Sequence, residues 1–172
     1  MEKTKAFYKN PKVDYLMFFF NLDIVPTKQD KFSKIDVIYS DESNIEFPLE
    51  NIYYRKNEKD SVISLDSLIK NYFVENKVEK IEKPKQVEVF LSISTKTKKR
   101  FEEVDVDNLA KCVLDCLNGV AFEDDSQVTR LLCNKYIDKL QYNSITIGIT
   151  ELSETRSGLT GDIKILSDVP WE

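Results

Sequence analysis

The feature that most constrains the fold is an apolar stripe in the middle of the chain, with a pair of acidic residues on either side of it. Residues 108–118 place apolar side chains at helical spacing, which predicts a helix with one face in the core. The stripe consists of Leu109, Cys112, Val113, Cys116 and Leu117. Gly119 follows it, as is typical of a residue just past the end of a helix.

Two aspartates precede this helix with one residue between them. If residues 101–107 form a strand, Val104 and Val106 face the core, and Asp105 and Asp107 lie on the other face, about 7 Å apart along the chain. Either Asp107 or Asn108 is then expected to cap the helix. Capping is the commoner explanation of such a pair, but it does not account for Asp105. We therefore expect the pair to bind a cation.

A second acid pair, Asp124 and Asp125, follows the helix after a short strand candidate at residues 120–122. A strand-helix-strand hairpin of this length is expected to return one of the two to the first pair. Lys111 lies four residues after Asp107, on the polar face of the helix, which puts an ammonium beside the acids. The chain has no histidine. Three or four oxygen ligands without histidine suit a hard cation such as Mg²⁺.

The sequence of this region, DVDNLAKCVLDCLNGVAFEDDSQV, closely resembles the central motif of the RusA-type Holliday junction resolvases. The family pattern is D-x-D-N-L-x-K, then D-x-L-N-G, then D-D-x-Q-V. The resemblance implies a homodimeric endodeoxyribonuclease that depends on Mg²⁺, with Mn²⁺ as a substitute and no nucleotide cofactor. It implies a RusA-like fold and a role in DNA recombination and repair, with the four-way junction as substrate.

The resemblance also implies roles for individual residues. Asp105, Asp107 and one of Asp124 or Asp125 would be metal ligands, and of the last two we favour Asp125. Lys111 would be the essential cation, offsetting charge near the phosphate or the leaving oxygen. The alternative is a branched-DNA-binding protein that does not cleave, or a nuclease for other branched or flap DNA, on the same fold.

A basic run directly precedes the first acid pair. It consists of Lys96, Lys98, Lys99 and Arg100. Such a run is more often a solvated loop, but its place at the mouth of the expected metal site makes it a candidate for DNA contacts.

The whole chain fits one α+β domain with a mixed sheet and two principal helices, at residues 64–75 and 108–118. Strand candidates lie at residues 13–24, 32–40, 87–94, 130–136 and 144–152, with shorter ones around Phe47 and Tyr53. The first is expected to be buried, and the last two are expected to pair with each other. We expect residues 1–152 to form the nuclease domain and residues 153–172 a polar C-terminal tail.

Composition excludes several classes of protein. The absence of histidine rules out catalytic sites that use a histidine as base or ligand. Three cysteines without a C-x-x-C spacing give no disulfide framework and indicate a reducing cytoplasm. No apolar run is long enough to span a membrane. The net charge of −5 argues against a protein that coats nucleic acid indiscriminately.

Overall fold

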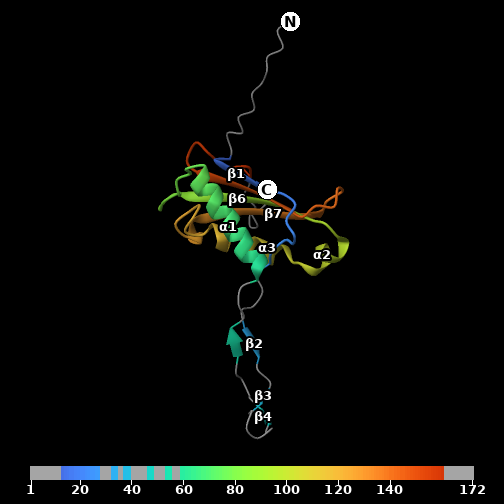
Figure 1. Cartoon of the computed structure of the whole chain (residues 1–172). Coiled ribbons are helices and arrows are strands. Elements are labelled where there is room, and N and C mark those ends of the chain that lie inside the picture. Colours follow the sequence, from blue (N-terminus) through green and yellow to red (C-terminus); the bar gives the residue numbers. More distant parts are fainter. Residues whose placement is uncertain are drawn as a thin grey trace, which may run out of the picture.

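The computed structural model describes residues 13–27 and 59–160, together with four short strands between residues 32 and 55. Two of these strands, β2 (Phe32–Lys34) and β5 (Tyr53–Arg55), pair with each other. The other two, β3 (Val37–Tyr39) and β4 (Glu46–Pro48), form a second pair. Both pairs lie outside the main sheet (Figure 1). Residues 161–172 of the expected tail lie outside the described residues.

The main sheet has four strands in the order β1-β8-β6-β7 (Figure 1). The strands are β1 (Tyr15–Phe19), β6 (Gln86–Thr95), β7 (Val128–Ile137) and β8 (Ser144–Leu152). β6 is parallel to β7 and antiparallel to β8, and β8 is antiparallel to β1. Together with the long helices α1 (Asp60–Glu75) and α3 (Val106–Leu117), this confirms the predicted α+β fold with a mixed sheet.

The core lies between one face of this sheet and the two long helices. Alternate residues of β6 and β8 are fully buried there, as period-two patterning predicts. They are Val87, Val89, Leu91, Ile93, Ile145, Ile147 and Ile149. Leu65, Ile69 and Phe73 of α1 and the predicted stripe of α3 pack in the same cluster, except that Cys112 is buried without belonging to it. The position of α3 is therefore fixed by its apolar face.

The predicted pairing of the last two strands is wrong. β7 and β8 lie on opposite sides of β6, so the segment 138–143 crosses over the end of that strand. The backbone N–H of Asp138 donates to the Thr95 carbonyl at 3.1 Å, and the Ser94 hydroxyl donates to the Tyr142 carbonyl at 2.9 Å. These contacts with the end of β6 replace the tight hairpin that was predicted.

β1 and α1 also differ from their predicted extents. β1 is a five-residue edge strand whose Met17 is fully buried, while Leu16 and Phe18 are 60% and 62% exposed on the uncovered face. Only one face of the expected buried strand is therefore in the core. α1 begins one turn before the predicted Ser64, because the Lys59 carbonyl accepts from the N–H groups of Val62 and Ile63.

Residues 157–160 return to the uncovered face of the sheet and cover Glu88. The buried Glu88 carboxylate accepts hydrogen bonds from the backbone N–H of Leu159 at 2.5 Å and from both the N–H and the hydroxyl of Thr160. Gly158 has φ +70°, and a Cβ there would lie 2.5 Å from a Glu88 oxygen. Only glycine fits this crossing without a shift.

Candidate metal centre and DNA-contact surface

Two extended residues, Val104 and Asp105, join the short helix α2 (Lys98–Glu103) to α3. Val104 points into the core and is only 3% exposed. Asp105 is the N-cap residue of α3, with φ −84° and ψ 144°, and Asp107 lies in the first turn. Both aspartates are exposed. The first acid pair is therefore presented at the N-terminus of α3.

The predicted strand over residues 101–107 is wrong, because most of that segment belongs to α2 or α3. The predicted cap at Asp107 or Asn108 is also displaced. α3 begins earlier, since the N–H of Leu109 donates to the Asp105 carbonyl at 3.1 Å. Val106, which strand alternation placed in the core, is consequently 39% exposed.

Asp105 stands at the capping position, but its side chain makes no capping hydrogen bond. Aspartate is favoured at such positions because its carboxylate usually accepts an N–H of the first turn. Here that carboxylate is left available to another group. Asp107 follows in the same turn, where the helix dipole favours negative charge. Capping therefore does not explain the Asp105 side chain.

Lys111 lies one turn after Asp107 on the exposed face of α3, as predicted. The opposite face is buried and contains the predicted stripe with Ala110 added. Gly119 adopts φ +76° directly after the Asn118 C-cap, so the predicted helix end is confirmed. The side chain of Lys111 thus has no part in the core.

The second acid pair lies in the loop between α3 and β7. Asp124 caps the short 3-10 helix η1 (Asp125–Gln127) in a capping box, and its carboxylate accepts the N–H of Ser126 at 2.9 Å. It also lies 3.6 Å from the ammonium of Lys83. Hydrogen bonds from Ser126, with Lys83 nearby, lower the pKa of Asp124. Asp125 is exposed and is not the capping residue.

A single chain does not bring the two acid pairs together. They flank α3, whose 12 residues span about 18 Å at a rise of 1.5 Å per residue. The backbone beside Asp105 contacts Lys135, whereas Asp125 lies just before β7 begins at Val128. Within the described residues, no three acidic or thiol side chains are grouped so as to hold a metal. The expected return of the second pair to the first is therefore not found within one copy.

In the basic run, Lys96 lies in the bend between β6 and α2, and the other three residues lie in α2 rather than in a loop. Lys98 and Lys99 are 79% and 85% exposed, and they pair loosely with Glu102 and Glu103 at 3.5 and 3.8 Å. Lys96, just before the helix, is also exposed.

Arg100 points inward instead. Its guanidinium donates to the Val25 carbonyl at 2.8 Å, and its Nε is buried without a hydrogen-bond partner in the described part of the chain. Three lysines, rather than four cations, therefore form the exposed basic surface beside the first acid pair.

The cysteines fit a structural role. Cys112 and Cys116 are buried in α3, and a hydrogen bond with Cys112 together with burial raises the pKa of Cys116 well above its usual range. Burial raises the pKa of Cys133 to about 11. Thiols with raised pKa values are poor nucleophiles and poor metal ligands at neutral pH.

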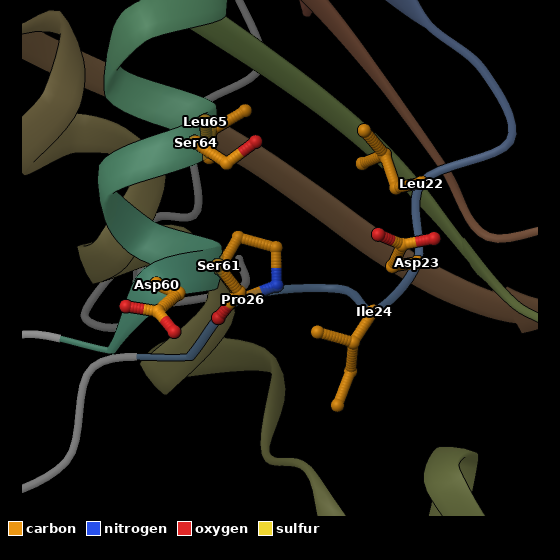
Figure 2. A pocket seen from close by; sticks show the side chains of 8 residues that line it. All are labelled: Leu22, Asp23, Ile24, Pro26, Asp60, Ser61, Ser64 and Leu65. Atoms are coloured by element: carbon orange, nitrogen blue, oxygen red, sulfur yellow. The ribbon is translucent and has the colours of Figure 1, made fainter.

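A separate hollow of about 250 Å³ lies between the segment after β1 and the first turns of α1 (Figure 2). Asp23 and Asp60 line opposite sides of it, and Ser61 and Ser64 lie on the helix side. Its two separated carboxylates do not form a metal-binding group.

Lys135, to which the sequence alone assigns no role, contacts the backbone of the α2–α3 junction with its ammonium. It donates to the carbonyls of Phe101, at 2.7 Å, and Val104. In the sequence, Lys135 lies within a predicted strand where the resemblance to the RusA-type resolvases continues weakly, but neither signal indicates its partners.

The fold and this junction define a mixed-sheet α+β protein that presents an acid pair at the start of an amphipathic helix. Comparison with known families matches residues 25–150 to the family described as Endodeoxyribonuclease RusA. The chain belongs to this family, whose members are endodeoxyribonucleases that act on Holliday junctions and generally depend on a divalent metal. No curated protein matches the chain. No helix in the described ranges is long and apolar enough to cross a membrane.

Proposed function

We propose that this protein is a divalent-metal-dependent endodeoxyribonuclease that resolves four-way DNA junctions by paired nicks in symmetry-related strands. The observation that carries the proposal is the exposed Asp105 carboxylate, which stands at the N-cap of α3 without capping it. Its neighbour Asp107 is exposed in the same turn. Membership of the RusA family supplies the class of reaction.

Asp105, Asp107 and Asp125 are the proposed metal ligands. Their carboxylate oxygens suit Mg²⁺ or Mn²⁺. A cation bound there would stabilise the negative charge of the reacting phosphate and lower the pKa of an attacking water. Asp125 is preferred to Asp124, because the Asp124 carboxylate already caps η1 and pairs with Lys83.

The proposed site is completed by a second copy of the chain. One copy separates the acid pairs by the length of α3, so Asp125 must come from the partner if all three ligands meet. Resolution of a four-way junction requires two sites related by a two-fold axis, which a C₂ homodimer provides. An antiparallel approach of two α3 helices would place the end of each beside the start of the other.

Two cationic groups complete the proposal. Lys111, one turn after Asp107, is proposed to offset charge on the reacting phosphate. Lys96, Lys98 and Lys99 are proposed to contact the phosphates of the DNA arms. The buried thiols are compatible with action in a reducing cytoplasm, which is also part of the proposal.

The first test measures nicking of a synthetic four-way junction in Mg²⁺, beside a linear duplex and a flap of the same sequences. We expect paired nicks in the junction, little cleavage of the other two substrates, and loss of activity in excess chelator. Mn²⁺ should substitute for Mg²⁺. Junction binding without nicking under all metals would favour the non-cleaving alternative, and preference for the flap would favour a nuclease for other branched DNA.

The second test asks whether the two acid pairs act across copies. Asp107→Asn and Asp125→Asn are each expected to be inactive, and a mixture that has exchanged subunits should recover nicking. In a mixed dimer, both changes fall in one shared site and leave the other intact. If each site were contained within one copy, every site in the mixture would stay defective. A mixture that stays inactive although subunit exchange is proven would therefore contradict a site shared between two copies. A mixture of Asp105→Asn and Asp107→Asn is the matched control, and it should stay inactive.

A further inference from the structure

Lys135 is a charged side chain on the helix-facing side of β7. Its register partner in β6 is Ile93, which is fully buried. The neighbouring residue on the same face, Cys133, lies 3.8 Å from the Val106 carbonyl. The Lys135 ammonium therefore sits under the start of α3, where an apolar residue would be the ordinary choice for a strand packed against a helix.

The contacts of the Lys135 ammonium explain why a lysine stands at this position. It donates to the carbonyl oxygens of Phe101, at 2.7 Å, and Val104. It also lies 4.5 Å from the centre of the Phe101 ring, within the range of a cation–π interaction. Carbonyls at the end of a helix lack partners within the helix and carry its negative dipole end, so a lysine satisfies both needs there.

These two carbonyls belong to the segment that leads into the first acid pair. Phe101 lies in α2, and Val104 directly precedes Asp105. The path of the chain between them sets where Asp105 stands and how the first turn, with Asp107, begins. The Asp105 side chain makes no capping hydrogen bond, so its position is set by its backbone, which the Leu109 N–H holds on the helix side. On the other side the backbone is held by the burial of Val104 and by the bond from Lys135 to the Val104 carbonyl.

We propose that Lys135 is a positioning residue for the metal-binding acid pair: it fixes the α2–α3 junction so that Asp105 and Asp107 present their carboxylates to one cation. The inference rests on the proposed function of that pair. Lys135 does not itself touch the metal or the DNA. Groups that orient metal ligands from behind typically change metal affinity by about 10- to 100-fold when they are lost.

The test compares Lys135→Met, an unbranched side chain one atom shorter that lacks the charge and the donors, with Lys135→Arg, which keeps both the charge and the donors. The exposed Lys139, just past the end of β7, gives Lys139→Met as the matched control. Binding of Mn²⁺ to the intact protein is measured by electron paramagnetic resonance, together with thermal unfolding of the same samples. The Mg²⁺ concentration that gives half-maximal nicking is measured in parallel.

Lys135→Met should weaken Mn²⁺ binding by about tenfold or more and raise the half-maximal Mg²⁺ concentration to a similar degree. The KM for the junction should stay close to wild type, and Lys135→Arg should recover most of the metal affinity. A lower unfolding temperature with unchanged Mn²⁺ affinity in the folded protein would overturn the proposal and leave Lys135 as a structural residue only.

Two further outcomes are separable. If Lys135→Met does not fold, Phe101→Leu, which removes the ring beside the ammonium, replaces it, and the same loss of metal affinity in smaller degree is expected. Unchanged affinity in that variant would also overturn the inference. Failure of the wild-type protein to bind Mn²⁺ would instead refute the metal site of the proposed function, independently of Lys135.

Discussion

The carboxylate of Asp124 accepts the backbone N–H of Ser126 at 2.9 Å, which commits this aspartate to the start of η1 and leaves its neighbour Asp125 exposed. The two acids of the D-D pair are therefore expected to behave differently. Asp124→Ala should lower the free energy of unfolding, because the start of η1 loses its cap. Asp125→Asn should leave stability unchanged and abolish nicking. Thermal unfolding and junction cleavage of both variants check this, and the opposite pattern would reverse the assignment.

Asp107→Asn and Lys111→Ala should separate DNA binding from cleavage. Asparagine at position 107 removes negative charge from an acidic surface, so junction affinity should persist or rise while nicking falls by orders of magnitude. Lys111→Ala should also stop nicking and keep the unfolding temperature, since the side chain is exposed. Asp115→Asn, on the exposed face of the same helix, is the control. If either the Asp107→Asn or the Lys111→Ala variant lost much stability, or kept its nicking activity, the role of that residue would be structural rather than catalytic.

The exposed lysines around α2 should determine the salt dependence of junction binding. Each phosphate contact contributes about 0.9 to the slope of log affinity against log salt concentration. Replacing Lys96, Lys98 and Lys99 together with alanine should therefore flatten the slope and weaken binding, without changing stability. The slope is measured by titration at several salt concentrations, and an unchanged slope would show that this surface does not touch DNA.

Arg100 should behave differently from those lysines. Its guanidinium donates to the Val25 carbonyl, so Arg100→Ala removes a tertiary hydrogen bond rather than an exposed charge. We expect a lower unfolding temperature, with a salt slope close to that of wild type. The reverse result, an unchanged unfolding temperature with a flatter slope, would place Arg100 on the DNA-contact surface.

Glu88 should make stability depend on acidic pH. Burial raises the pKa of its carboxyl, but hydrogen bonds from Thr160 and Leu159 and the charge of Arg130 outweigh it, so the net pKa is lowered. A carboxyl with a lowered pKa stabilises the folded state above its unfolded pKa of about 4.3, and this contribution is lost as pH falls through the lower folded value. Glu88→Gln should flatten the acid side of the stability profile, measured by denaturant unfolding from pH 3 to 7. An equally steep profile in the variant would contradict this.

Local periodicity made the buried faces predictable. The stripe of α3 and the alternation in β6 and β8 depend only on residues close in sequence, and the structure confirms both. The start of α3 was not predictable in this way, because Val104 and Val106 fit strand alternation. That segment is instead divided between α2 and α3, and its junction is held by Lys135, which is distant in sequence.

The order of the strands in the sheet was not predictable from the sequence for a related reason. The short connection at residues 138–143 suits a hairpin between neighbours, but β6 lies between the two strands it joins. The separation of the acid pairs has a related cause: α3 is part of the connection that joins β6 to its parallel neighbour β7, and the pairs lie at the two ends of this helix. The motif identifies these acids but carries no information about which copy supplies each one.

The parallel pairing of β6 with β7 also bears on how the molecule moves. β7 lies at the edge of the sheet, and in the chain it is reached from β6 only through α2 and α3. If β7 detached from the sheet, it would release the α2–α3 junction that Lys135 holds, while β1, β8 and β6 stayed paired. Edge elements with exposed backbone open at lower free energy than the centre of a sheet. We therefore expect the amide hydrogens of β7 and of the α2–α3 junction to exchange together with solvent. They should exchange before those of β6 and β8. The part of the protein that carries the first acid pair would then unfold as its own cooperative unit.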